Sequence, residues 1–197
     1  AIGWRALLVN TGGSNTAVGR SGLSANTSGT ANTAVGALAA DSNTTGSYNV
    51  ALGGDVPGNS NAAFSANTTG NFNVAIGNAS LHTATTADSN VGIGYKALFA
   101  NTTASNNTAV GFQAGLANTT GNENTFLGNK AGVVITTGSD NTFVGSEAGD
   151  GTDDGAENVA VGKSALSANC GNGNTAMGHA AGRLVTGTQN TIMGESS

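Results

Sequence analysis

Charge and cross-links are scarce in this chain of 197 residues. Asp, Glu, Lys and Arg make up 9% of the sequence, and six basic residues against eleven acidic ones leave a net charge of −5. Basic clusters supply much of the affinity for nucleic acid and for anionic membranes, so neither is an expected partner. The single cysteine excludes an internal disulfide. No apolar run is longer than the four residues at 6–9, which is far shorter than the ~20 residues of a membrane-spanning helix.

The sequence instead contains a short motif that returns along its whole length. Asn-Thr-Ala-Val-Gly at residues 15–19 is the first of eleven copies, most of them 17 residues apart; the last two steps are 16 residues and one step is 24. Self-similarity at a short fixed period is the signature of a solenoid. We therefore predict an all-β, parallel β-solenoid of eleven to twelve coils, with residues 1–197 forming a single domain.

Each copy of the motif has the pattern of a short strand. The residue after Asn is always Thr or Val, and the residue before the final Gly is always large and aliphatic. Side chains alternate between the two faces of a strand, so these two columns share one face. We predict that this face fills the coil, with the aliphatic column as its core: Val18, Val35, Leu52, Ile76, Ile93, Val110, Leu127, Val144, Val161, Met177 and Met193.

The residue between these two columns points to the opposite face and is also apolar, mostly Ala. If the coil has one interior, this second face lies outside it, and a long exposed apolar stripe marks an interface. We therefore predict a homo-oligomer packed along the middle column: Ala17, Ala34, Ala51, Ala75, Ala109, Phe126, Phe143, Ala160, Ala176 and Ile192.

The segments between the strands follow a second pattern, Gly-x-x-Ala-Leu, and then a turn such as Asn118-Thr119-Thr120-Gly121. We expect the Ala-Leu pair to form a second short strand or an extended corner that adds to the core. Asn, Thr and Gly suit the turn because they bond their own backbone or accept a positive φ. The Asn that opens each motif is expected to stack on its counterparts as a hydrogen-bonded ladder.

Few residues suggest bound ligands or chemistry. The acidic turn at residues 150–155 places Asp150, Thr152 and Asp154 as in the first half of an EF-hand loop, but position twelve is Val161 where calcium needs a bidentate Glu. These three residues are the candidate calcium ligands; a solvated acidic turn is the alternative. His82 and His179 occupy unrelated coil positions, and Cys170 replaces a turn Thr that we expect to be exposed. We predict no enzyme site and no other cofactor.

One coil is longer than the others. Residues 54–60 form an insertion that includes the only proline, and insertions in solenoids map to loops that often bind ligands. The candidate ligand loop is Asp55, Val56, Pro57 and Asn59; a neutral bulge is the alternative.

The motif resembles the head repeats of trimeric autotransporter adhesins, whose hallmark is Asn-Ser-Val-Ala-Ile-Gly. This resemblance covers essentially the whole chain and implies a left-handed parallel β-roll, a homotrimer around a common axis, and an adhesive role on a bacterial surface. Similar repeats occur in phage tail fibres. The coil here is longer than the roughly 14 residues typical of the family, and its signature is one residue shorter. Because the chain starts in the middle of a repeat, at Ala1-Ile2-Gly3, we expect a slice of a longer fibre.

Three functions are compatible with this repeat. The first is an extracellular structural and adhesive fibre, on a cell or a virion, that binds a host-surface protein or glycan. The second is a monomeric ice- or carbohydrate-binding solenoid, which needs outward Thr arrays, whereas the strand Thr is expected to point inward here. The third is a hexapeptide-repeat acyltransferase, which is disfavoured because each coil has one aliphatic-Gly pair and not three.

Overall fold

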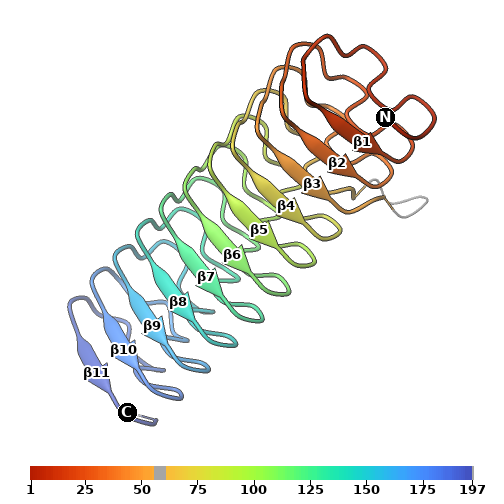
Figure 1. The fold of residues 1–197 in the computed structure, drawn as a ribbon. Coiled ribbons are helices and arrows are strands. Elements are labelled where there is room, and N and C mark those ends of the chain that lie inside the picture. The colour runs from red at the N-terminus through yellow and green to blue at the C-terminus, as the bar shows by residue number, and fades with distance from the viewer. Residues whose placement is uncertain (56–60, 197) are drawn as a thin grey trace.

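The computed structural model describes residues 1–55 and 61–196, and in this part of the chain the regular elements are eleven parallel strands and no helix. The strands pair in sequence order to form one sheet along a rod, with the chain ends at opposite ends of the rod (Figure 1). The strands are β1 Thr16–Val18, β2 Thr33–Val35, β3 Val50–Leu52, β4 Val74–Ile76, β5 Val91–Ile93, β6 Thr108–Val110, β7 Thr125–Leu127, β8 Thr142–Val144, β9 Val159–Val161, β10 Thr175–Met177 and β11 Thr191–Met193. The predicted parallel β-solenoid is confirmed.

Every strand begins directly after the repeated Asn, and the register keeps equivalent positions opposite each other. Thr16 pairs with Thr33, and Val18 pairs with Val35. The long step also keeps this register, because Val50 pairs with Val74 across the insertion. Each position of the motif therefore becomes a row of similar side chains that runs along the rod.

The two faces of the sheet are reversed relative to the sequence prediction. The predicted interface column lies inside the coil: its Ala and Phe residues are at most 1% exposed, and Ile192 packs against the same core. The predicted core column lies outside, where its members are half-buried or exposed, and Met193 reaches 70%. The corrected core therefore contains Ala17, Ala34, Ala51, Ala75, Ala109, Phe126, Phe143, Ala160 and Ala176. The outward face carries Val18, Val35, Leu52, Ile76, Ile93, Val110, Leu127, Val144, Val161, Met177 and Met193.

The physical reason for the reversal is the width of the coil. Leu23, Leu81, Leu98 and Leu166 are fully buried at the corner of the coil that follows the strand, where they join the middle column in one core. The buried side chains of the repeated Asn share this interior. The space left opposite the Leu accepts Ala, and a column of Val, Leu, Ile and Met does not fit there.

The corner is not the second strand that the sequence suggested. It is a turn in which the buried Leu has a left-handed backbone, with φ of 49° at Leu23 and 51° at Leu98. Its amide still bonds to the next coil, as Leu98 N donates to Ala114 O at 3.0 Å. The prediction that the corner contributes Ala and Leu to the core is confirmed.

The predicted Asn ladder is present along the whole sheet. At each step the side-chain oxygen of one Asn accepts a hydrogen bond from the backbone N–H of the next, as in Asn124 Oδ1 with Asn141 N at 2.9 Å. The side-chain nitrogen usually donates to a turn carbonyl of the following coil, as Asn141 Nδ2 does to Gly155 O at 2.9 Å. Buried polar groups must be paired in this way, so the ladder holds each coil to its neighbour.

Candidate interaction face

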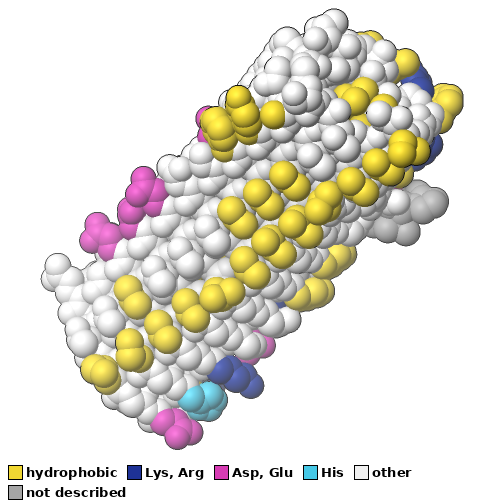
Figure 2. Space-filling view, viewed as in Figure 1, with side chains coloured by type: hydrophobic (Ala, Val, Ile, Leu, Met, Phe, Trp, Pro, Cys, Tyr) yellow, Lys and Arg dark blue, Asp and Glu magenta, His cyan; other side chains and the backbone are white. Residues whose placement is uncertain are grey.

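The most prominent surface feature is the outward face of the sheet, formed by the first and third residues of every strand. Val35, Leu127 and Met177 on this face are 40%, 47% and 45% exposed. A row of hydrophobic side chains follows this face along the rod (Figure 2). Single exposed aliphatic residues are ordinary, but a row of half-buried and exposed aliphatic residues repeated on eleven strands is typical of an interaction surface.

No charged side chain lies on the strands of this face, because their outward positions are all Thr, Val, Leu, Ile or Met. Covering the face with another surface would therefore desolvate no ion. The first outward position is Thr in most strands and Val in β3, β4, β5 and β9, so the face is most apolar over β3–β5. The predicted inward direction of the strand Thr is wrong.

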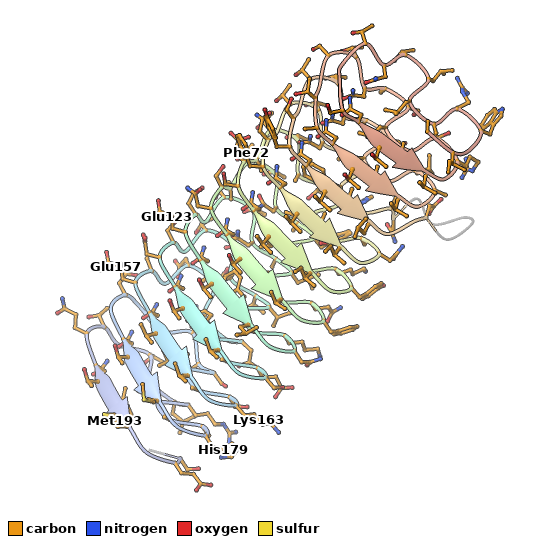
Figure 3. The ribbon with its side chains drawn as sticks, in the orientation of Figure 1. Phe72, Glu123, Glu157, Lys163, His179 and Met193 are labelled. Carbon is orange, nitrogen blue, oxygen red and sulfur yellow. The ribbon has the colours of Figure 1, made fainter. Side chains whose placement is uncertain are left out.

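Charged residues gather along the two edges of this face. The edge before the strands carries Glu123, Asp140 and Glu157, each directly preceding a repeated Asn; all three are exposed. The other edge carries residues one or two positions after the strand-ending Gly, and these include five of the six Lys and Arg: Arg5, Arg20, Lys96, Lys130 and Lys163. Glu123 and Glu157 lie along one side of the rod and Lys163 along the other (Figure 3).

Stacked aromatic pairs lie on the same two edges. Tyr48 and Phe72 stack at 5.1 Å between ring centroids on the edge before the strands. Tyr95 and Phe112 stack at 5.5 Å on the opposite edge. All four rings are more than 40% exposed. The rings in each pair come from successive coils, so the same one-coil spacing that aligns the strands also stacks the aromatic side chains.

The candidate calcium turn does not assemble into a cation site. Thr152 is fully buried, and its hydroxyl lies 3.3 Å from Cys170 Sγ inside the coil. Asp154 is exposed on the outside of the turn, and Asp150 is half-buried in the segment before it. Among the residues described, no three His, Cys, Asp or Glu side chains are grouped to hold a metal ion. The calcium prediction is therefore wrong in its geometry, because alternation along the turn sends Thr152 inward.

The histidines and the cysteine lie in separate surroundings. His82 Nδ1 is 2.9 Å from Ser65 Oγ, beside a shallow depression that Asp41 also lines. Burial raises the pKa of the Asp41 carboxyl, while backbone N–H groups and the nearby His82 oppose the rise. His179 Nδ1 lies 3.5 Å from Glu195 Oε1 near the C-terminal coil. Cys170 is 2% exposed, so its expected exposure is wrong; the shortened turn brings it into the core.

The inserted loop lies mostly outside the described residues. Asp55 is described, and its carboxylate accepts a hydrogen bond from Asn61 N at 3.1 Å. Val56, Pro57 and Asn59 of the candidate ligand loop fall in the range that is not described. The role of the loop as a ligand site stays a prediction.

Comparison with protein-family models, with curated proteins and with solved structures shows no match to this chain. In the described part of the chain, no helix has the length and apolar character needed to cross a bilayer. The outward face and its charged edges are therefore the surface features that bear on function.

Proposed function

We propose that this chain is a segment of an extracellular structural and adhesive fibre, on a bacterial cell or a phage tail. In this fibre, copies of the chain run parallel and cover each other's outward faces. The resemblance to adhesin head repeats supports three copies around a common axis and a left-handed winding. The observation that carries the proposal is the outward face itself, which is uncharged on every strand and has Val, Leu, Ile or Met as its third residue along the whole rod.

The size of the face supports association with a second copy. At a rise of about 4.8 Å per coil, eleven three-residue strands span roughly 50 Å by 10 Å, or on the order of 500 Å². The flanking side chains bring this toward the ~800 Å² that each partner contributes to a standard interface. A copy of the same chain presents the same uncharged rows at the same spacing, so it matches the face in both chemistry and period.

The repeated polar turns of the coils support an adhesive role. The turns on the remaining sides display Thr, Ser and Asn at one-coil spacing; Thr69, Thr103 and Thr120 are among the exposed members of one row. Parallel copies would multiply these polar rows around one rod. Weak individual contacts to a host glycan or protein then add up through effective concentration.

A matched pair of variants tests the proposal. Val144→Glu places a carboxylate in the outward face, and Thr137→Glu places one on an exposed turn away from it. We expect light scattering after size exclusion to give the mass of a trimer for the wild type and for Thr137→Glu, and of a monomer for Val144→Glu. A monomeric wild type at micromolar concentration would contradict the proposal.

A second candidate, an ice-binding solenoid, gains support from the corrected orientation. Thr16, Thr33 and Thr108 point outward beside Val, so the rows of Thr that such a protein needs are on the surface after all. The same face cannot bind ice while copies cover it. Thermal hysteresis measured on the purified chain separates the two: a monomer with strong hysteresis favours ice binding, and an oligomer without it favours the fibre.

A further inference from the structure

We propose that the two charged edges of the outward face fix how copies meet: the acidic edge of one copy pairs with the basic edge of the next, which makes the association parallel and in register. This inference rests on the self-association proposed above. It concerns the orientation and axial register of the copies, which the apolar rows alone do not set.

The apolar rows alone are ambiguous because every coil resembles the next. A copy that slips by one coil, about 4.8 Å, loses a single rung of contact. A uniform stripe also accepts a copy that runs in the opposite direction. Specific association therefore needs a feature that differs between the edges and between the coils.

The edges supply this difference in sign. Glu123 precedes β7 on the acidic edge and Lys130 follows β7 on the basic edge. Glu157 likewise precedes β9, and Lys163 follows β9 one position closer to the strand than Lys130 is to β7. Six or seven residues of largely extended chain span roughly 20 Å, so these partners are too far apart to pair within one chain. The single ion pair among the described residues is His179–Glu195, so these four side chains have no partner of opposite charge in their own chain.

The opposite charges of the two edges determine which relative orientation of two copies is favourable. When two such faces pack together with their chains parallel, the acidic edge of each lies against the basic edge of the other, and the same holds around a closed ring. In an antiparallel face-to-face pair, each edge meets its own kind, and Glu123, Asp140 and Glu157 face another set of carboxylates. In the parallel case with no axial slip, Glu123 meets Lys130 of the neighbouring copy at the level of β7, and Glu157 meets Lys163 at the level of β9.

The basic edge is not uniform, because Asp55, Glu147 and Glu195 also lie one or two positions after a strand-ending Gly. Of these three, only Glu147 has an acidic residue on the opposite edge at its own level. At β8 both edges are acidic, with Asp140 on one side and Glu147 on the other. Lys130 and Lys163 lie one coil away on either side, which reduces the local repulsion. Glu147→Lys is therefore expected to strengthen association, because it places a basic residue opposite Asp140 at this level.

The test compares charge reversals on each edge with reversal on both. Glu123→Lys with Glu157→Lys makes both edges basic at the levels of β7 and β9, and Lys130→Glu with Lys163→Glu makes both acidic at these two levels. We expect each double variant to weaken self-association by at least about tenfold, because like charges then meet across the interface. The quadruple reversal restores opposite charges and is expected to associate like the wild type. Asp153→Lys with Asp154→Lys, on an exposed turn away from the edges, is the control for net charge.

Sedimentation equilibrium gives the affinities, and circular dichroism confirms that each variant folds. A monomeric wild type would contradict the proposed fibre itself. A wild type that associates while both double variants associate equally well would overturn the edge-pairing inference alone, and so would a quadruple reversal that stays dissociated. Disulfide trapping in a Cys170→Ser background reports the register. Thr108→Cys, on the outward face, is expected to cross-link to the same position of a neighbouring copy, and efficient trapping only in mixtures with Thr125→Cys, one coil away, would also overturn the inference.

Discussion

The ring of Phe126 occupies the space that a side chain at Gly132 would need. A Cβ added to Gly132 would lie 2.4 Å from Phe126 Cδ1, and one added to Gly149 would lie 2.3 Å from Cδ2 of Phe143. In other coils the same two positions hold a small residue and a Leu, as Ala75 and Leu81 do. Several coils therefore hold either Ala with Leu or Phe with Gly at these two positions, while Ala109 with Gly115 is a smaller pair whose space is filled by Phe126 of the next coil.

Because Phe126 and Gly132 share one space, we expect the stability of the fold to depend on both side chains together. Phe126→Ala leaves a cavity and should cost about 3–5 kcal/mol, whereas Gly132→Leu overfills the coil. The combination of both changes recreates the Ala–Leu pair, and we expect it to be more stable than either single variant. Chemical denaturation of the three variants measures this coupling. Strictly additive losses would show that the two residues do not share one space.

The Asn ladder predicts that replacing two neighbouring members, Asn141 and Asn158, lowers the free energy of unfolding by unequal amounts. Asn141 accepts a hydrogen bond from Asn158 N and donates to Gly155 O, so both ends of its amide are paired. Asn158 Nδ2 has no partner in the described structure, because the following turn is one residue shorter. We expect Asn141→Ala to lower the free energy of unfolding by about 2–3 kcal/mol, and Asn158→Ala by roughly 1 kcal/mol less. Equal losses at the two rungs would count against this reading of the ladder.

The glycine that ends each strand allows two coils to approach closely. At Gly111, φ is +143° and an added Cβ would lie 2.3 Å from Gly128 O. Gly13 has nothing within 4 Å of such a Cβ. Gly111→Ala should therefore destabilise the fold by about 1–3 kcal/mol, while Gly13→Ala changes it little. Thermal unfolding of the two variants makes the comparison, and matching melting temperatures would refute it.

Asp41 predicts a dependence of stability on pH. Burial raises the pKa of its carboxyl above the ordinary value of 3.8, so the folded chain binds this proton more tightly than the unfolded chain does. The contribution of Asp41 to stability is therefore greatest at low pH, and it falls as the pH rises from 3.8 through the raised pKa. Asp41→Asn should be more stable than the wild type at pH 7 and equal to it at pH 3. Denaturation curves at the two pH values test this, and an unchanged stability at pH 7 would argue against it.

The repeat predicted the strands, their parallel order and the Asn ladder, because these depend on period and residue type alone. The direction of the faces was wrong because alternation shows which residues share a face and not which face is inside. Both faces are apolar, so hydrophobicity did not decide between them. The exchange between Phe126 and Gly132 was a usable signal in the sequence, since residues that trade volume must pack together. The two charged edges could not be recognised in the sequence, because the residues that share an edge come from different coils and line up only in the stacked structure.

The mass of the chain in solution tests the central claim most directly. Sedimentation equilibrium at micromolar concentration and about 0.15 M salt should give a multiple of the 19.0 kDa chain mass, with three copies expected. The same measurement on Val144→Glu should give a single chain. A wild-type protein that stays at 19.0 kDa under these conditions, folded and with its outward face open to water, would contradict the account.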